Sequence, residues 1–113
     1  MVNMGYEPDR GDVVWLNFDP QKGHEQSGRR PAMVLSPRKY NGKTGLLVAC
    51  PITSKVKGYP FEVSLPAGLE IQGVVLSDQV KSLDWRERRA EFVCRATEEV
   101  VEEVRCKLML LFE

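Results

Sequence analysis

The residues between positions 19 and 30 have side chains suited to acid–base chemistry and to anion binding. Their sequence is Asp-Pro-Gln-Lys-Gly-His-Glu-Gln-Ser-Gly-Arg-Arg, twelve residues without apolar periodicity. It holds the only histidine, His24, with Glu25 beside it and Arg29 and Arg30 at its end. A carboxylate can accept a proton, and a guanidinium offers bidentate donors to phosphate oxygens. Connections between neighbouring strands usually have about two to five residues, so this long one is a candidate functional loop. The alternative is a solvated hairpin loop without chemistry.

Positive charge is concentrated in and after this loop. The whole chain balances 16 Lys and Arg against 16 Asp and Glu, but residues 22–43 hold six basic residues and one carboxylate, a net charge of +5. A local basic patch of this kind is what an anionic polymer such as RNA requires. We therefore predict a substrate-binding patch that contains the following lysines and arginine: Lys22, Arg38, Lys39 and Lys57.

The counts of histidine and cysteine exclude several kinds of site. One histidine rules out two-histidine catalysis within one chain, and Cys50, Cys94 and Cys106 are too far apart for a clustered zinc site. We expect free thiols, no metal and no cofactor. The longest aliphatic stretch is far shorter than the ~20 residues of a membrane span, and no signal sequence is visible at the N-terminus. These features predict a cytoplasmic protein without membrane contact.

The elements that must position these residues are mostly strands. Residues 13–18 and 59–65 alternate apolar and polar side chains, whereas 32–35 and 46–50 are apolar throughout and fit strands covered on both faces. Shorter candidates are residues 74–76 and 92–94. Gly, Pro and Asn punctuation separates the runs, as at Asn41-Gly42.

The last seventeen residues change to a helical period. Thr97 is a plausible N-cap, followed by two glutamates in the first turn. At about 100° per residue, six apolar side chains share an arc of about 120°. They are Val100, Val101, Val104, Leu108, Leu111 and Phe112. Met109 and Leu110, outside this stripe, are candidates for contact with a second subunit. We predict one mainly β domain over residues 1–113, a small β-barrel or strongly bent sheet with a C-terminal helix.

Several motifs in order along the chain resemble the MazF/PemK toxin family. They are Gly11-Asp12-Val13-Val14-Trp15, Gly23-His24-Glu25-Gln26-Ser27-Gly28-Arg29-Arg30-Pro31, Pro51-Ile52-Thr53-Ser54, Lys57-Gly58-Tyr59-Pro60-Phe61-Glu62-Val63 and Ser77-Asp78-Gln79-Val80-Lys81-Ser82. The resemblance runs from about residue 6 to the end. It implies an SH3-like barrel, a homodimer, and a toxic, metal-independent endoribonuclease that cuts single-stranded mRNA at specific sequences. It also implies a cognate, MazE-like antitoxin that occupies the RNA groove.

The resemblance assigns catalytic roles to Glu25, Arg30 and Thr53. His24 resembles a histidine of some PemK-type members, and Asp78 matches the aspartate of an Arg-x-Asp-Gln motif in which this chain has Leu76 instead of arginine. That acid–base pair therefore does not transfer intact. Further candidates for catalysis or RNA binding are Arg29, Ser54 and Gln79.

Metal-free RNA cleavage needs a base for the 2′-hydroxyl, donors for the phosphate and an acid for the 5′-oxygen, and it yields 2′,3′-cyclic phosphate and 5′-hydroxyl ends. We assign the base to Glu25 and electrostatic stabilisation to Arg30, since a guanidinium keeps its proton. His24 is a candidate acid, and Thr53 would orient the phosphate or the attacking hydroxyl. Each residue has a structural alternative, such as an ion pair or a turn. Two other functions stay open: a non-catalytic toxin that binds a protein such as gyrase, and an RNA-binding module without cleavage.

Overall fold

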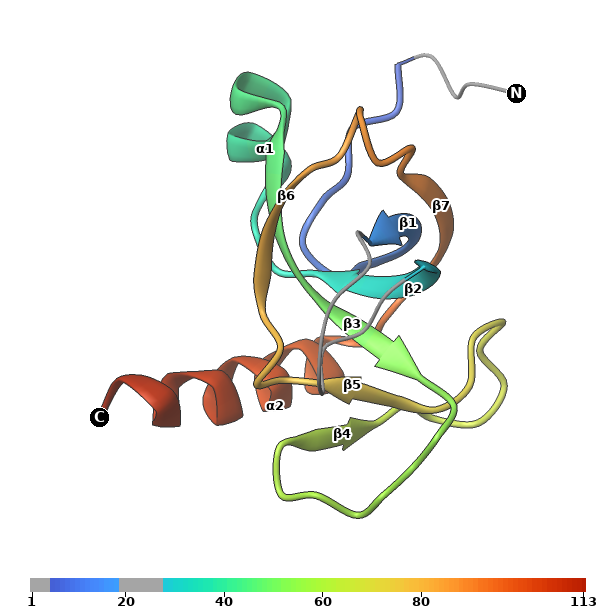
Figure 1. The fold of residues 1–113 in the computed structure, drawn as a ribbon, viewed down its shortest axis with the longest axis vertical. Coiled ribbons are helices and arrows are strands. Elements are labelled where there is room, and N and C mark those ends of the chain that lie inside the picture. The colour runs from blue at the N-terminus through green and yellow to red at the C-terminus, as the bar shows by residue number, and fades with distance from the viewer. Residues whose placement is uncertain (1–4, 19–27) are drawn as a thin grey trace.

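The computed structural model describes residues 5–18 and 28–113. Within them, the strands form one strongly bent antiparallel sheet in the order β4-β5-β3-β2-β1-β7, with β6 also paired to β3 (Figure 1). The strands are β1 (Asp12–Phe18), β2 (Gly28–Val34), β3 (Leu46–Thr53), β4 (Glu62–Ser64), β5 (Val74–Leu76), β6 (Lys81–Asp84) and β7 (Glu91–Arg95). The helices are α1 (Arg38–Thr44), α2 (Glu98–Met109) and the short 3₁₀ helix η1 (Leu110–Phe112). The prediction of a mainly β fold with a C-terminal helix is confirmed.

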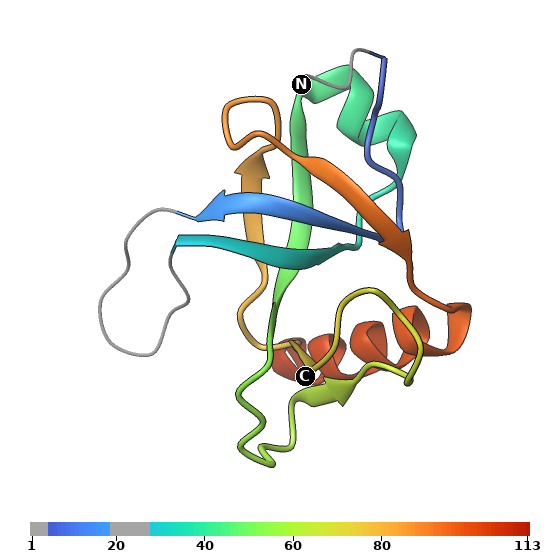
Figure 2. The ribbon, with the colours of Figure 1, turned by 90° about the vertical axis from the view of Figure 1, so that its right-hand side faces the viewer.

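The central strands are covered on both faces, because the sheet bends between two hydrophobic cores. Val14 and Leu16 of β1 pack into one core with Leu83 and Trp85, while Val13 packs into the other with α2 and β4. The apolar runs at 32–35 and 46–50 are thus explained, as each alternates between the two cores. Figure 2 shows β1 and β2 crossing β3 steeply. β3 is the strand that joins the two parts of the sheet.

Helix α2 packs one face against β4 and the adjacent core. The Thr97 hydroxyl caps it by accepting a hydrogen bond from the Val100 amide at 3.3 Å, as its sequence predicts. Val100 and Val104 are buried. The predicted stripe is wrong at its end, because Leu111 and Phe112 lie in η1 and are exposed. The chain tightens into η1 there, so a 100° period no longer applies.

Three other sequence expectations differ from the structure. Asn41-Gly42 lies between β2 and β3 as expected, but it is part of helix α1, where buried Asn41 bonds to Ser36 and to the Pro8 carbonyl. These long-range bonds outweigh the local turn preference of Asn-Gly. The strand expected from residue 59 begins only at Glu62, and β6 was not expected at all, because only Leu83 of its four residues is buried. In the described part of the chain, no helix is long and apolar enough to cross a membrane.

Candidate functional site

Thr53 ends β3 at the corner where that strand leaves the sheet. Its side chain is buried, and its hydroxyl oxygen accepts a hydrogen bond from the Lys55 amide at 3.1 Å. On one side it pairs with Val74 of β5. Ser54, the next residue, is exposed. The sheet therefore fixes the position of the Thr53 hydroxyl, and Ser54 begins a solvent-exposed loop.

Gly73 packs directly on the backbone of Thr53, a contact that sequence reasoning missed. A Cβ atom at Gly73 would collide with the Thr53 carbonyl oxygen and lie 2.8 Å from its carbonyl carbon. Gly73 also has a φ of +125°, which L-residues rarely adopt. Only glycine lets β5 begin this close to the end of β3. The sequence signal was limited to a glycine before an apolar strand, which does not reveal its neighbour.

Arg30 lies at the same end of the β2–β3 ladder as Thr53. The last pair of that ladder is Ala32 with Pro51, and Arg30 and Thr53 each lie two residues beyond it. Because side chains alternate along a strand, Arg30 shares the face of Ala32, and Thr53 shares the face of Pro51. If the alternation of the ladder continues past its last pair, both side chains lie on one side of the sheet at this end, which is compatible with the hypothesis that they act together.

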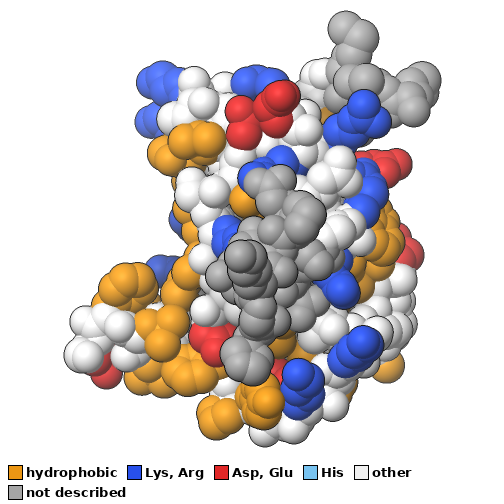
Figure 3. Space-filling view, in the orientation of Figure 1, with side chains coloured by type: hydrophobic (Ala, Val, Ile, Leu, Met, Phe, Trp, Pro, Cys, Tyr) orange, Lys and Arg blue, Asp and Glu red, His pale blue; other side chains and the backbone are white. Residues whose placement is uncertain are grey.

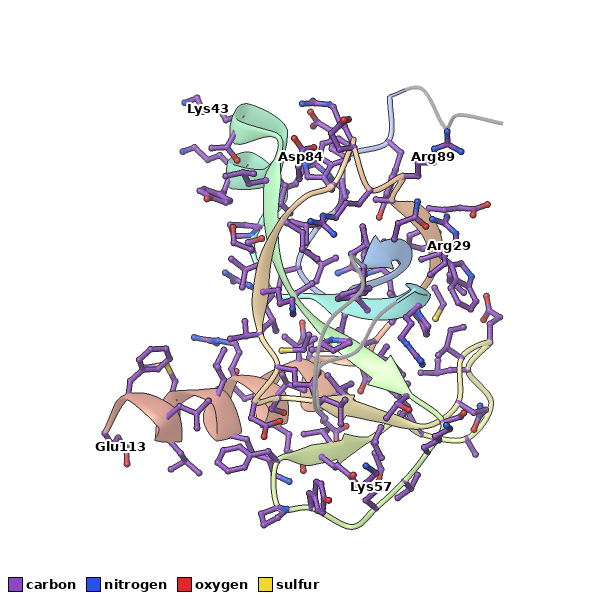
Figure 4. All side chains as sticks on the ribbon, in the orientation of Figure 1. Arg29, Lys43, Lys57, Asp84, Arg89 and Glu113 are labelled. Atoms are coloured by element: carbon purple, nitrogen blue, oxygen red, sulfur yellow. The ribbon has the colours of Figure 1, made fainter. Side chains whose placement is uncertain are left out.

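Arg29 belongs to a different environment from its neighbour. Its guanidinium donates to the Asn17 side chain at 2.9 Å and to the Arg89 carbonyl at 3.0 Å, and it pairs with Glu91 at 3.2 Å. Figure 4 shows Arg29 and Arg89 toward the β7 side of the molecule. Arg29 therefore ties the β1–β2 hairpin to β7, on the sheet face opposite to that of Arg30.

Asp78 and Gln79 lie in the turn that follows β5. Asp78 is exposed, and the Gln79 amide donates to the Leu76 carbonyl at 3.1 Å. Leu76, at the arginine position of the family motif, is a buried core residue. Burial raises the pKa of the nearby Cys50 thiol to about 12, with a smaller contribution from the Asp78 charge. This thiol is therefore protonated at neutral pH and is no nucleophile.

The predicted basic patch is divided between the two ends of β3. Arg38 and Lys39 open α1, which precedes the start of β3, whereas Lys57 lies in the loop after its end. Eight residues at about 3.3 Å each make β3 up to about 26 Å long. Figure 4 shows Lys43 of α1 and Lys57 at opposite ends of the molecule. Of the patch lysines and arginine in the described residues, only Lys57 follows the Thr53 end of β3.

Lys22, His24 and Glu25 lie outside the described residues. Their proposed roles remain hypotheses from the sequence. Within the described ranges, no group of three or more metal-ligating side chains occurs. The three cysteines are free, and Cys50 and Cys94 are buried.

Comparison with known proteins finds a family that matches nearly the whole chain. A family model described as "PemK-like, MazF-like toxin of type II toxin-antitoxin system" matches residues 9–112. The chain is 50% identical over 106 residues to an endoribonuclease toxin MazF of Escherichia coli K12, covering 94% of this chain and 95% of that protein. It is 38% identical to the endoribonuclease toxin ChpB of the same strain, covering 95% of this chain and 96% of that protein.

Solved structures agree with the sequence relatives. A crystal structure of MazF from Deinococcus radiodurans superimposes with a TM-score of 0.91 at 64% identity, covering 95% of this chain and 97% of that one. A MazE–MazF structure from the same organism gives a TM-score of 0.84 at 58% identity, covering 95% of this chain and 96% of that one.

Proposed function

Because the chain belongs to the PemK-like, MazF-like toxin family of type II toxin–antitoxin systems, we propose that it is an endoribonuclease that cuts single-stranded mRNA without a metal ion. The single observation that carries the proposal is the strand register, which places Arg30 and Thr53 each two residues beyond the last pair of the β2–β3 ladder, at the same end. The names of the relatives favour catalysis over the protein-binding alternative.

The proposed reaction is an attack of the RNA 2′-hydroxyl on the adjacent phosphorus. Glu25 takes the 2′-hydroxyl proton, the 5′-oxygen leaves, and His24 supplies the proton that this oxygen needs. The products are a 2′,3′-cyclic phosphate and a 5′-hydroxyl. Arg30 stabilises the charge that grows on the phosphate oxygens, and the Thr53 hydroxyl orients the phosphate. The buried, hydrogen-bonded position of Thr53 supports this role, because a fixed donor costs little reorganisation during the reaction.

Other candidate residues have supporting parts in this proposal. Ser54 and Lys57 contact the RNA backbone beside Thr53, and Asp78 and Gln79 contact bases from the turn after β5. Arg29 acts by holding the hairpin rather than by touching the substrate, because Asn17, Glu91 and the Arg89 carbonyl already engage its donors.

The partners in this proposal are RNA, a MazE-like antitoxin and a second copy of the chain. The antitoxin is supported by the Deinococcus MazE–MazF structures. For the dimer, Met109 and Leu110 are more than half exposed, as is Phe112 at the end of η1. Figure 3 shows hydrophobic side chains gathered at the lower left, where α2 ends in Figure 1. An apolar surface of this kind favours burial against another subunit. The free thiols support a reducing, cytoplasmic location.

The test uses purified protein and a long single-stranded RNA in excess EDTA. We expect discrete fragments whose ends carry a 2′,3′-cyclic phosphate and a 5′-hydroxyl. Intact RNA, or cleavage only after magnesium is returned, contradicts the proposal. A DNA supercoiling assay with the same protein tests the gyrase-binding alternative, and we expect no effect.

A further inference from the structure

The loop between β3 and β4 is exposed except at its last residue, Phe61, yet its backbone is hydrogen-bonded. Every residue from 54 to 60 is exposed. At the start of the loop, the Lys55 amide donates to the Thr53 hydroxyl at 3.1 Å. Near its end, the Glu62 amide donates to the Tyr59 carbonyl at 3.1 Å. Hydrogen bonds to side-chain and backbone acceptors thus hold this exposed loop in place.

Glu62 makes the central attachment. One oxygen of its carboxylate accepts from the Lys57 amide at 3.1 Å, and the other accepts from the Gly58 amide at 3.0 Å. Gly58 has a φ of +78° and open space around its α-carbon, so glycine suits the turn that directs both amides to one carboxylate. Hydrogen bonds to an ionised acceptor are stronger than neutral ones, and here two of them share one side chain.

The backbone of Glu62 is itself held in place by two neighbouring elements. Glu62 begins β4 and pairs with Leu76 of β5, and its carbonyl accepts from the Lys107 ammonium of α2 at 2.9 Å. Lys107 also pairs with Glu103 at 3.5 Å. The carboxylate therefore extends from a strand held by the sheet on one side and by a helix on the other, so it can fix the loop.

The fixed loop presents an aromatic ring and a cation within six residues of Thr53 along the chain. Tyr59 is 60% exposed. The Lys57 ammonium lies 5.7 Å from the centre of its ring. Exposed aromatic rings stack on the bases of single-stranded RNA, and lysines bind its phosphates. Lys57 and Tyr59 together have the chemistry to hold one nucleotide.

We propose that Glu62 is a positioning residue that prefolds this loop, so that Lys57 and Tyr59 form a ready contact for a nucleotide of the RNA beside Thr53. The inference rests on the proposed function for its ligand. Its energetic basis is that a loop already ordered in the free protein does not lose conformational entropy when RNA binds. Glu62 acts through the loop and does not touch the RNA.

The direction in which Glu62→Gln changes RNA affinity distinguishes a positioning role from a purely electrostatic one. Glu62→Gln removes a negative charge near an anionic ligand, and charge alone would make RNA binding tighter. A glutamine has an NH2 group in place of one carboxylate oxygen, so the backbone amide that faces this group loses its acceptor. Loss of loop order makes binding weaker. The two effects thus oppose each other, and the proposal predicts that the second wins.

The experiment measures amide hydrogen exchange and RNA affinity on the same full-length variants. We expect Glu62→Gln to speed exchange at Lys57 and Gly58 by at least about tenfold, and Glu62→Ala to speed it more. With a 2′-O-methyl single-stranded RNA, which lacks the attacking hydroxyl, we expect Kd to rise about threefold to tenfold. Glu102→Gln is the matched control, since it removes one exposed α2 carboxylate that pairs with Arg105. It should change neither quantity.

A double variant tests whether Glu62 acts through the aromatic contact. The double variant Tyr59→Ala/Glu62→Gln should bind RNA only slightly more weakly than Tyr59→Ala alone. Without the tyrosine ring, the loop has no aromatic contact for Glu62 to position. Unchanged exchange at Lys57 and Gly58, or unchanged or tighter RNA binding by Glu62→Gln, overturns the proposal. Wild-type protein that neither binds nor cleaves RNA overturns the proposed function and the RNA role of the loop, while the exchange data still report on the Glu62 attachment.

Discussion

The two ends of β3 are both rich in polar side chains, but those side chains have different partners. At the start, α1 contacts the N-terminal segment, which bonds to Asp12. Asp12 is buried where β1 begins, and it accepts from the Tyr6 hydroxyl at 2.7 Å, from the Asp9 amide at 3.0 Å and from Arg95 at 2.7 Å. Burial, together with the bond to Asp12, raises the pKa of Tyr6 above its usual range. Arg38 lies 3.9 Å from Asp9. These interactions hold the N-terminal segment onto the sheet.

At the other end of β3, the polar groups are arranged around a corner. Thr53 is fixed by the sheet, Arg30 shares its side of the ladder, and the Glu62-held loop follows. The comparison shows that Arg38, near the start of β3, is bound to the N-terminal segment, while the proposed function assigns the fewer charges at the end of β3 to a ligand. Changes at the two ends should therefore damage different properties.

The largest effect is expected from Arg30→Ala. Removing a donor that stabilises transition-state charge costs about 10²–10³-fold in kcat. Because Arg30 is only partly buried, the midpoint of thermal unfolding should change little. Single-turnover cleavage of RNA measures the rate. Arg105→Ala, which removes a surface arginine of α2, controls for the loss of positive charge, and a wild-type rate in folded Arg30→Ala would contradict the assignment.

In contrast to Arg30→Ala, Asp12→Ala is expected to reduce stability and to leave the cleavage rate nearly unchanged. This change removes three hydrogen bonds and leaves the Tyr6 hydroxyl and the Asp9 amide without their acceptor. The free energy of unfolding should fall by about 2–3 kcal/mol, measured by urea denaturation. Cleavage per folded molecule should stay near the wild-type rate. A large loss of rate without loss of stability would place this cluster in the active site instead.

A third change, Gly73→Ala, sharpens the account of the Thr53 corner. The added methyl group must push the Thr53 backbone away, so we expect kcat to fall about tenfold while KM changes less. Gly68→Ala is the matched control: Gly68 also has a positive φ, +97°, but a methyl group there meets nothing within 4 Å. Both variants lose stability from backbone strain, and only Gly73→Ala should lose turnover in addition. Equal turnover in both variants would remove Gly73 from the site.

The smallest effect is expected from the double variant Arg38→Ala/Lys39→Ala. These charges lie at the far end of β3 from Thr53, so the rate at saturating RNA should change less than about threefold. If the basic window of residues 22–43 acted as one RNA-binding patch, the loss of cleavage rate would be larger. Cleavage at two salt concentrations checks the result, since residues that contact phosphates also change the salt dependence of binding.

Much of the fold follows from periodicity in the sequence, and the exceptions have physical causes. The C-terminal helix that begins after Thr97, and the strands buried on both faces, can be predicted from the sequence. Burial of one helix face or of both sheet faces leaves a recognisable pattern of apolar residues. Helix α1 leaves no such pattern, because it is stabilised by Asn41, whose partner Pro8 lies 33 residues away in the sequence.

The candidate site was predicted less completely than the fold. Motifs indicate Arg30 and Thr53, and the ladder register places these two residues, 23 positions apart, at the same end of β2 and β3. Gly73 and Glu62 were missed because they act through backbone atoms of other residues. Composition also grouped Arg38 and Lys39 with the loop, although a strand up to about 26 Å long separates α1 from Thr53.

The most direct test of the division between the two ends is backbone NMR of the protein with a 2′-O-methyl single-stranded RNA containing its mapped cut site. We predict that the largest amide shifts fall at Arg30, Thr53 and the 55–59 loop, with little change in α1. Shifts concentrated in α1 and the Asp12 cluster, with the Thr53 corner unchanged, would contradict the account.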